Sequence, residues 1–529
     1  MSDEQTILRT GDKLWLSIGS LVLLGYLVVR AASQHVSFDE SWHIYYATIS
    51  DPWKLVKEIG RDMHPPTCSI LLRPFVAIGP DPLWPRLLSI VPSALQPLLW
   101  FWLLRRIGIS RPFAWASTIV LCTSHVFLDF AMIVRGYTLA HTVLMLACLA
   151  IAKAILSANS RRRIGVLACV AVGGAFWTEY SAAFAIAALA GGVIVTGMLD
   201  RDFGRTVTEA VRRTRWPERA FLLLAVLGIA AFYVASFGLR ALPHGNEWFP
   251  VEGQSAADFV ARGLVLDTYY FTPFDLRDVS WGALVITAAL GMTFGVGLRL
   301  AGRPQLSREA RLQGSVLLAL IGLVVGMALL GVLHKYPWGG FVRHQLILVP
   351  FLHAALVIVL QELTPNVPRV RAIVASVLVA GAVLVGWRSH ATFDTNEVQH
   401  APLWQSAIDE AFAEDSTIPV CVPNCTFFGT AGTRLDTLDV EFEREIGEWD
   451  LYAAGSPRRA MLRPRFVWTI DPVPSEELLT ALRAKCDELG FDAIWLMTMR
   501  FGGSPIEDRV ALAAELERRC ESAGFAVSR

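Results

Sequence analysis

The chain has 529 residues, of which 54% are hydrophobic and only 18% are charged, whereas charged residues make up about 25% of a soluble domain. Most of the chain is therefore predicted to lie in a membrane. Its 47 basic and 47 acidic residues give a net charge of zero, which argues against nucleic acid as a partner because nucleic-acid-binding domains carry basic surfaces.

Eleven apolar runs have the length of about 20 residues that a helix needs to cross a bilayer. In chain order they cover residues 14–32, 86–104, 112–131, 137–156, 163–178, 181–199, 220–238, 281–300, 313–333, 344–361 and 370–387. The first run also resembles a signal peptide with a cleavage site near Ala31, although it is long for one and contains Arg30. We therefore predict a polytopic α-helical membrane protein with about 11 spans.

Basic residues are concentrated in every second connection between these spans. They are Arg105, Arg106, Arg111, Lys153, Arg161, Arg162, Arg163, Arg201, Arg205, Arg212, Arg213, Arg215, Arg219, Arg299, Arg303, Arg308, Arg311, Arg369 and Arg371. Because short loops rich in lysine and arginine stay in the cytoplasm, we expect a plasma-membrane or inner-membrane protein with a cytoplasmic N-terminus. An odd number of spans then places the C-terminus outside, in the periplasm or the extracellular space.

Three connections on the external side carry most of the remaining polar character. The first covers residues 33–85 and contains the amphipathic segment Trp53–Glu58, which predicts a helix along the membrane surface. The second covers residues 239–280 and is rich in aromatic and acidic residues. A third and shorter connection holds His334–Gly340.

The chain changes character near residue 388. Helical patterns at about 403–414, 475–489 and 507–523 alternate with strand-like runs at 418–422, 465–470 and 492–497. Such alternation is typical of an α/β domain with a mostly parallel sheet. We therefore predict a membrane domain over residues 1–387 and a soluble α/β domain over residues 388–529, outside the cytoplasm.

Four cysteines of this soluble domain would lie in an oxidising compartment, where disulfides form. They are Cys421, Cys425, Cys486 and Cys520, and they allow three connectivities. Our preferred pairing is Cys421–Cys425 with Cys486–Cys520. The alternative is a cytoplasmic tail with four free thiols.

Polar residues follow several spans at the external ends. They are Asp39 and Glu40, His64, Arg135 with Tyr137, Glu179, Lys335 and Arg343. Carboxylates are costly near hydrocarbon and usually mark a function there. A carboxylate that faces several cations suits transfer of a group from a phosphorylated donor, because the cations hold the phosphate and the carboxylate takes a proton from the nucleophile.

Each of these residues also has a purely structural explanation. The acidic pair could be a solvated helix end, the two arginines could contact lipid headgroups, and His64 could belong to a rigid loop beside Pro65-Pro66. Glu179 could be an ordinary loop charge, and Lys335 could lie at the interface. The functional interpretation depends on their convergence at one face of the membrane.

Four motifs, in this order along residues 14–387, resemble those of the GT-C membrane glycosyltransferases. They are Asp39-Glu40, His64-Pro65-Pro66 with Pro85-Arg86-Leu87-Leu88, Arg135-Gly136-Tyr137-Thr138-Leu139, and Arg343-His344-Gln345-Leu346. The family's counterparts are D-E, H-P-P with R-L-P-S, R-x-Y-A-L, and R-Y-x-L-P-L-L-P. The resemblance is to the branch with protein O-mannosyltransferases, lipid A aminoarabinose transferases and related bacterial lipopolysaccharide transferases. The chain departs from these patterns at three positions. Leu88 stands where relatives often have Pro, Glu179 where many have His, and His344 where Tyr is common.

This resemblance implies an inverting enzyme that moves one sugar from a polyprenyl-phosphate donor to an acceptor hydroxyl of the cell envelope. Asp39 would be the general base, and Glu40 would position the acceptor or help to hold a divalent metal ion in members that use one. The residues implied at the donor phosphate are Arg135 and Arg343, with His64 and Lys335 behind them. The sugar or acceptor pocket would take Glu179, Tyr137, Trp248 and Tyr269.

Other functional classes are less well supported by the sequence. A transporter or flippase for a lipid-linked glycan would be expected to show an inverted repeat or paired broken spans, and neither is visible. Transfer of phosphoethanolamine, a non-sugar headgroup, would need a metal-rich external domain, and no metal-ligand spacing is present in the tail. A non-catalytic scaffold would not require the intact acidic pair.

Overall fold

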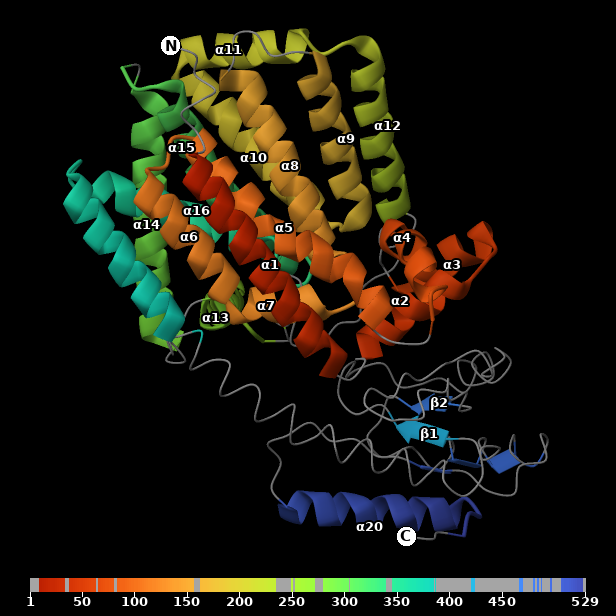
Figure 1. The fold of residues 1–529 in the computed structure, drawn as a ribbon. Coiled ribbons are helices and arrows are strands. Elements are labelled where there is room, and N and C mark those ends of the chain that lie inside the picture. The colour runs from red at the N-terminus through yellow and green to blue at the C-terminus, as the bar shows by residue number, and fades with distance from the viewer. Residues whose placement is uncertain are drawn as a thin grey trace. The chain divides into compact units, whose positions relative to one another are not determined.

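The computed structural model divides the chain into two units, residues 1–242 with 247–390 and residues 243–246 with 391–529 (Figure 1). In the first unit the structure describes residues 9–33, 38–62, 65–79, 83–156, 162–234, 249–250, 253–271, 279–303, 305–338, 345–384 and 386. In the second it describes residues 420–423, 466–469, 479–480, 483–484, 487, 495–496 and 506–526.

The described part of the first unit is helical. Its elements are α1 (Thr10–Ser33), α2 (Phe38–Thr48), α3 (Pro52–Asp62), α4 (Thr67–Val76), α5 (Leu83–Arg106), α6 (Arg111–Thr123), α7 (His125–Met132), α8 (Tyr137–Leu156), α9 (Arg162–Thr178), α10 (Ser181–Leu199), α11 (Arg201–Arg212), α12 (Trp216–Tyr233), α13 (Ala256–Phe271), α14 (Val279–Gly302), α15 (Arg308–Val332) and α16 (Leu348–Leu363). Residues 368–384 are helical as well.

Six described helices are long and apolar enough to cross a membrane, or seven if the bent pair α6 and α7 forms one span. They are α1, α5, α8, α10, α14 and α15. The predicted number of eleven is therefore too high for the described part of the chain. Helix α16, in the run at 344–361, has only 16 residues and is about 24 Å long, short of the roughly 30 Å hydrocarbon core.

The predicted span at 112–131 is interrupted at Ser124. This residue has an extended backbone conformation between α6 and α7, and the axes of the two helices differ in direction by 56°. Because the helices on both sides of the break are apolar, the mean hydropathy over the length of a span stays high across Ser124. The sequence therefore shows one continuous apolar run.

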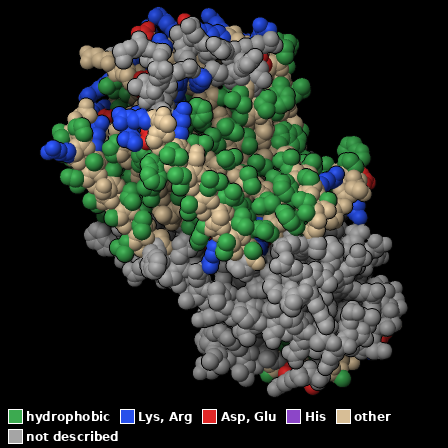
Figure 2. Space-filling model, viewed as in Figure 1, with side chains coloured by type: hydrophobic (Ala, Val, Ile, Leu, Met, Phe, Trp, Pro, Cys, Tyr) green, Lys and Arg blue, Asp and Glu red, His purple; other side chains and the backbone are tan. Residues whose placement is uncertain are grey.

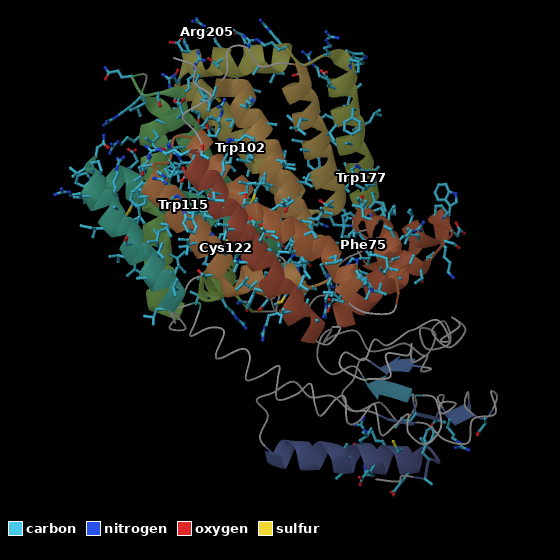
Figure 3. All side chains as sticks on the ribbon, viewed as in Figure 1. Phe75, Trp102, Trp115, Cys122, Trp177 and Arg205 are labelled. Carbon is cyan, nitrogen blue, oxygen red and sulfur yellow. The ribbon has the colours of Figure 1, made fainter. Side chains whose placement is uncertain are left out.

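Helices α5 and α8 pack against each other, as do α10 and α15, and all four helices contribute buried side chains to the main hydrophobic core. Figure 2 shows hydrophobic side chains over the middle of this unit and many lysines and arginines at the end that carries α11. Figure 3 places Arg205 at that end and Phe75 of α4 toward the opposite one. This distribution is typical of a membrane protein, with an apolar belt and a basic end.

The connection between α1 and α5 contains the predicted amphipathic helix. This helix is α3, which buries Leu55 and Ile59 against Tyr46 and Ile49 and leaves Trp53 82% exposed. The amphipathic pattern of the sequence is therefore confirmed at this segment.

The described strands of the second unit form a three-stranded parallel sheet in the order β2-β1-β3. Its strands are β1 (Val420–Pro423), β2 (Phe466–Thr469) and β3 (Trp495–Leu496), and α20 (Ile506–Ser522) follows them. Each strand overlaps a run predicted as strand, and α20 overlaps the helix predicted at 507–523. The helix predicted at 403–414 lies outside the described residues.

The cysteine prediction for this unit is wrong in one pairing. Cys520 is a buried free cysteine, so the structure does not contain a Cys486–Cys520 disulfide. Burial raises the pKa of the Cys520 thiol, and the carboxylates of Glu517 and Glu521 raise it further, which makes this thiol a weak nucleophile. Cys425 lies outside the described residues, and Cys421–Cys425 stays a prediction.

Candidate functional site

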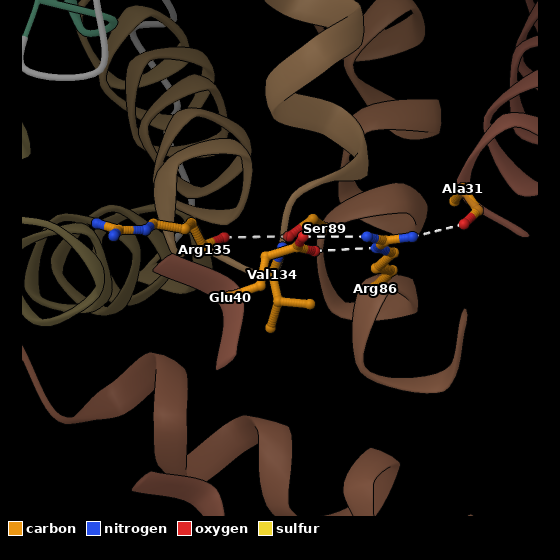
Figure 4. Close-up of polar contacts among 6 residues, drawn as sticks. All are labelled: Ala31, Glu40, Arg86, Ser89, Val134 and Arg135. Atoms are coloured by element: carbon orange, nitrogen blue, oxygen red, sulfur yellow. Dashed lines mark hydrogen bonds and ion pairs between the residues drawn. The ribbon is translucent and has the colours of Figure 1, made fainter. Parts of the chain in front are cut away.

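The side chain of Glu40 in α2 forms a buried ion pair with Arg86 in α5 (Figure 4). Glu40 Oε1 accepts a hydrogen bond from Arg86 Nε at 2.9 Å, and Glu40 Oε2 accepts one from Arg86 Nη2 at 3.0 Å. Both residues are 1% exposed. Two parallel hydrogen bonds of this kind fix the relative orientation of a carboxylate and a guanidinium, so this pair ties α2 to α5.

The same pair also binds two backbone groups from other elements. The Val134 N–H donates to Glu40 Oε1 at 3.0 Å, and Arg86 Nη1 donates to the Ala31 carbonyl at 2.5 Å. Val134 belongs to the connection between α7 and α8, and Ala31 lies in the last turn of α1. One carboxylate and one guanidinium therefore hold four segments of the chain together.

Arg135 follows Val134, and both its backbone carbonyl and its backbone N–H form hydrogen bonds. Ser89 Oγ donates to the Arg135 carbonyl at 3.1 Å, and the Arg135 N–H donates to the Ile133 carbonyl at 2.8 Å. The Arg135 side chain extends away from the Glu40–Arg86 pair (Figure 4). Its Nη1 donates to the Tyr137 hydroxyl at 3.2 Å, and its Cζ lies 5.8 Å from the centroid of that ring.

Gly136 allows this connection to pass close to the end of α9. A Cβ atom on Gly136 would lie 2.6 Å from the Thr178 carbonyl oxygen and 3.5 Å from Cys68 Cβ. Glycine is therefore required here for steric reasons. The close approach brings together the segment of Arg135, the start of α4 and the segment of Glu179.

The charges that act on the Cys68 thiol also indicate that the segments of Arg135 and Glu179 lie close to α4. Burial raises the pKa of the Cys68 thiol to about 12, Glu179 raises it as well, and Arg135 opposes this rise. Both charged groups therefore lie near Cys68 in α4. Glu179 is 9% exposed and Arg135 is 6% exposed, so the structure places a buried carboxylate and a buried guanidinium in one region.

We predict that Gly136→Ala destabilises the protein by about 1–3 kcal/mol, because the new methyl group meets a backbone carbonyl that cannot rotate away. Thermal unfolding of the detergent-purified protein measures the change. The matched control is Gly191→Ala in α10, where a Cβ atom would have no neighbour within 4 Å. Equal unfolding temperatures for the two variants would contradict the steric role of Gly136.

The segment that precedes α16 is held near α8. Gln345 Nε2 donates to the Pro337 carbonyl at 2.9 Å, and His141, one turn beyond Tyr137, hydrogen-bonds to the backbone of Leu346. The residues that directly follow the Arg343-His344 motif therefore lie against the helix that begins at Tyr137.

The structure describes only some of the predicted site residues. It brings Glu40, Arg135, Tyr137 and Glu179 into one region, and it leaves Lys335 exposed just after α15. Asp39 and Tyr269 lie in α2 and α13, but their side chains are outside the described residues, as are His64, Trp248 and Arg343 entirely.

Arg86 was not predicted as a site residue. It is the only charged residue between Leu83 and Leu104, and an isolated charge in an apolar span usually has a function and a partner. That signal could have identified Arg86 from sequence, but it could not have identified Glu40 as its partner. Among the described residues, no group of three or more His, Cys, Asp or Glu side chains could hold a metal ion.

The chain is similar in structure to ArnT from Cupriavidus metallidurans, a GT-C lipid A aminoarabinose transferase. The structure of ArnT bound to undecaprenyl phosphate shares 12% identity with a TM-score of 0.49, over 92% of this chain and 90% of that one. Its apo structure shares 14% identity with a TM-score of 0.45, over 78% and 83%. No family model matches the chain, and no curated protein sequence matches it significantly. With TM-scores below 0.5, a functional assignment rests on the residues of this chain.

Proposed function

We propose that this protein is an inverting membrane glycosyltransferase of the GT-C type. It would move a single sugar from a polyprenyl-phosphate donor to an acceptor hydroxyl of a glycan, glycolipid or protein at the external face. The observation that carries this proposal is the link between the acidic pair and the arginine connection. Glu40, adjacent to Asp39 in α2, accepts a hydrogen bond from Val134, adjacent to Arg135, at 3.0 Å.

The structure supports different roles for the two members of the acidic pair. Glu40 accepts three hydrogen bonds from Arg86 and Val134 and is 1% exposed. This arrangement favours a positioning role over the acceptor or metal contact that the family resemblance implies. Asp39 is therefore our candidate for the catalytic base.

In the proposed reaction, the Asp39 carboxylate takes the proton of the acceptor hydroxyl. The acceptor oxygen then attacks the anomeric carbon of the donor as the bond from that carbon to the phosphate oxygen breaks. The polyprenyl phosphate leaves with the electron pair of the broken bond, and attack from the opposite side inverts the anomeric centre. Negative charge develops on the leaving oxygen, where a guanidinium stabilises it most effectively.

Arg135 is the described cation best suited to this task. It is 6% exposed, and a charge-assisted hydrogen bond to phosphate is stronger in a buried setting than in water. Arg343, His64 and Lys335 are proposed as further donor contacts, and the packing of Gln345 and Leu346 near α8 supports the assignment of Arg343. Tyr137, Glu179, Trp248 and Tyr269 are proposed for the sugar or acceptor pocket.

The proposed orientation places α2 at the external face. α1 runs from Asp12, which pairs with Arg111 at 2.7 Å, to Ala31 beside Arg86. The basic connections and the acidic pair therefore lie at opposite ends of α1, as basic cytoplasmic loops would require. With this orientation, residues 388–529 form the proposed α/β domain outside the cytoplasm.

We predict that Arg135→Glu weakens binding of a polyprenyl phosphate by about 100-fold, because a charge-assisted hydrogen bond is lost and a repulsion is added. Equilibrium binding of undecaprenyl phosphate to the detergent-purified protein measures this change. The control is Lys54→Glu, which makes the same change in charge at an exposed position of α3. Unchanged affinity in a folded Arg135→Glu variant would identify Arg135 as a structural residue.

Transfer can be separated from transport with a single experiment. Proteoliposomes that contain the protein are incubated with labelled polyprenyl-phosphate sugars, with and without envelope acceptors. A glycosyltransferase consumes the donor and labels the acceptor. A flippase moves the labelled lipid between leaflets without consuming it, and that result would overturn the proposal.

A further inference from the structure

Helix α11 packs against α10 and α8 at the basic end of the first unit (Figure 1). Its first turn is fixed there by Asp200, which accepts a hydrogen bond from the Phe203 N–H at 2.9 Å and pairs with Arg311 of α15 at 2.6 Å. Phe203 is fully buried. The opposite face of α11 is consequently held at the surface of the molecule.

Many arginines at this end are paired with carboxylates. Arg111 pairs with Asp12 at 2.7 Å and Arg299 with Glu362 at 3.4 Å. Arg205 of α11 lies 3.3 Å from Asp202, and Arg213, which directly follows α11, lies 3.5 Å from Glu209. These cations are at least partly neutralised within the protein.

The corner between α11 and α12 is different. Arg212, Arg215 and Arg219 are exposed, and the Glu218 carboxylate in the same corner accepts a hydrogen bond from the backbone N–H of Arg215. Arg219 Nη2 donates to the carbonyls of Val211 and Arg212 at 3.0 Å each. This contact fixes Arg219 beside the end of α11, so three exposed guanidinium groups and the single buried carboxylate of Glu218 occupy this corner.

An apolar surface begins at the same corner. Trp216, the first residue of α12, is 73% exposed, and the next turns of α12 expose Leu223, Leu224 and Leu227 at 53–68%. Exposed tryptophans mark the level of the headgroups, and apolar side chains beyond them face the acyl chains. In a bilayer, this order of side chains would place the three guanidinium groups at headgroup depth, beside a surface that acyl chains can cover.

We propose that Arg212, Arg215 and Arg219, together with Trp216, bind the phosphate headgroup of an anionic glycerophospholipid in the leaflet at the basic end. The lipid chains then lie along α12. The charge of the site, its depth and its adjoining apolar surface match a phosphodiester that carries two acyl chains. A soluble anion would not cover the apolar surface of α12, and a neutral lipid would not pair with the three guanidinium groups.

The test is native mass spectrometry of the full-length protein with added phosphatidylglycerol or phosphatidylcholine. Each basic residue near a membrane surface strengthens binding of anionic lipid by about fivefold, so the variant with Arg212→Gln, Arg215→Gln and Arg219→Gln should bind phosphatidylglycerol about 100-fold more weakly. Binding of phosphatidylcholine should not change. The control variant combines Arg205→Gln, Arg213→Gln and Arg299→Gln, which removes three paired arginines from the same end.

A second variant keeps Arg219, which contacts the end of α11, and carries only Arg212→Gln and Arg215→Gln. It should weaken phosphatidylglycerol binding about 25-fold without lowering the unfolding temperature. Equal losses in the control variant would show a diffuse basic surface and overturn the proposal. Displacement of phosphatidylglycerol by millimolar inorganic phosphate would also overturn it, because the site would then recognise a free anion.

Discussion

The Asp39→Asn variant is expected to lose sugar transfer almost completely while it remains folded and binds donor normally. An amide has the shape of the carboxylate but cannot accept the proton of the acceptor hydroxyl, and a positioned base contributes about 100-fold to 10,000-fold to such a step. We therefore expect a fall of about 1,000-fold in kcat. The measurement is the rate at which label passes from a polyprenyl-phosphate sugar to the acceptor.

The control for this substitution is Asp51→Asn. Asp51 is an exposed acid of the same connection between α1 and α5, and its Oδ1 accepts a hydrogen bond from the Trp53 N–H at 2.8 Å. An asparagine side chain can also make this contact. Transfer by this variant should stay near that of the natural protein. Near-normal turnover by Asp39→Asn would remove Asp39 from the role of base.

The second large effect is expected at Arg86. Arg86→Ala leaves the Glu40 carboxylate buried without its cation, and breaking a buried pair in this way costs about 3–5 kcal/mol. The variant should unfold at a much lower temperature and show little transfer. The control Arg205→Ala breaks a pair whose side chains are 77% and 79% exposed, and such pairs contribute about 1 kcal/mol or less.

A double substitution separates stability from positioning. Glu40→Leu with Arg86→Met replaces both charges by apolar side chains of similar size, and such replacements of buried pairs are often neutral or stabilising. The unfolding temperature should therefore recover in part, because the Val134 N–H and the Ala31 carbonyl still lose their partners. Transfer should stay low, because the Val134 N–H no longer has its carboxylate partner and the Arg135 connection loses a support. Recovery of both properties would show that the pair is only structural.

Local sequence patterns predicted the elements that depend on neighbouring residues. The amphipathic repeat of α3, the long apolar helices and the strands at 420–423, 466–469 and 495–496 follow from periodicity that the chain carries within a few residues. The break at Ser124 escaped prediction because two short apolar helices have the same hydropathy as one long helix. The free thiol of Cys520 escaped it because spacing does not determine which cysteines meet.

The candidate site was only partly predictable for a similar reason. Placement at a helix end made Asp39 and Glu40 conspicuous, and the cations on the same face suggested a phosphate donor. The partner of Glu40, however, lies 46 residues away in sequence, and only packing of α2 against the start of α5 brings the two groups together. The sequence therefore suggested candidate residue types for the site, whereas the contacts between these residues required the structure.

The hydrogen bond from Arg86 to the Ala31 carbonyl links the acidic pair to a helix with an exposed apolar face. Helix α1 exposes Leu21, Val22 and Val29 by 66–70%, and these side chains would contact lipid in the proposed membrane domain. The guanidinium that holds the last turn of α1 also holds Glu40. In the proposed arrangement, a displacement of α1 within the bilayer would therefore reach the acidic pair through Arg86, without contact between lipid and Glu40.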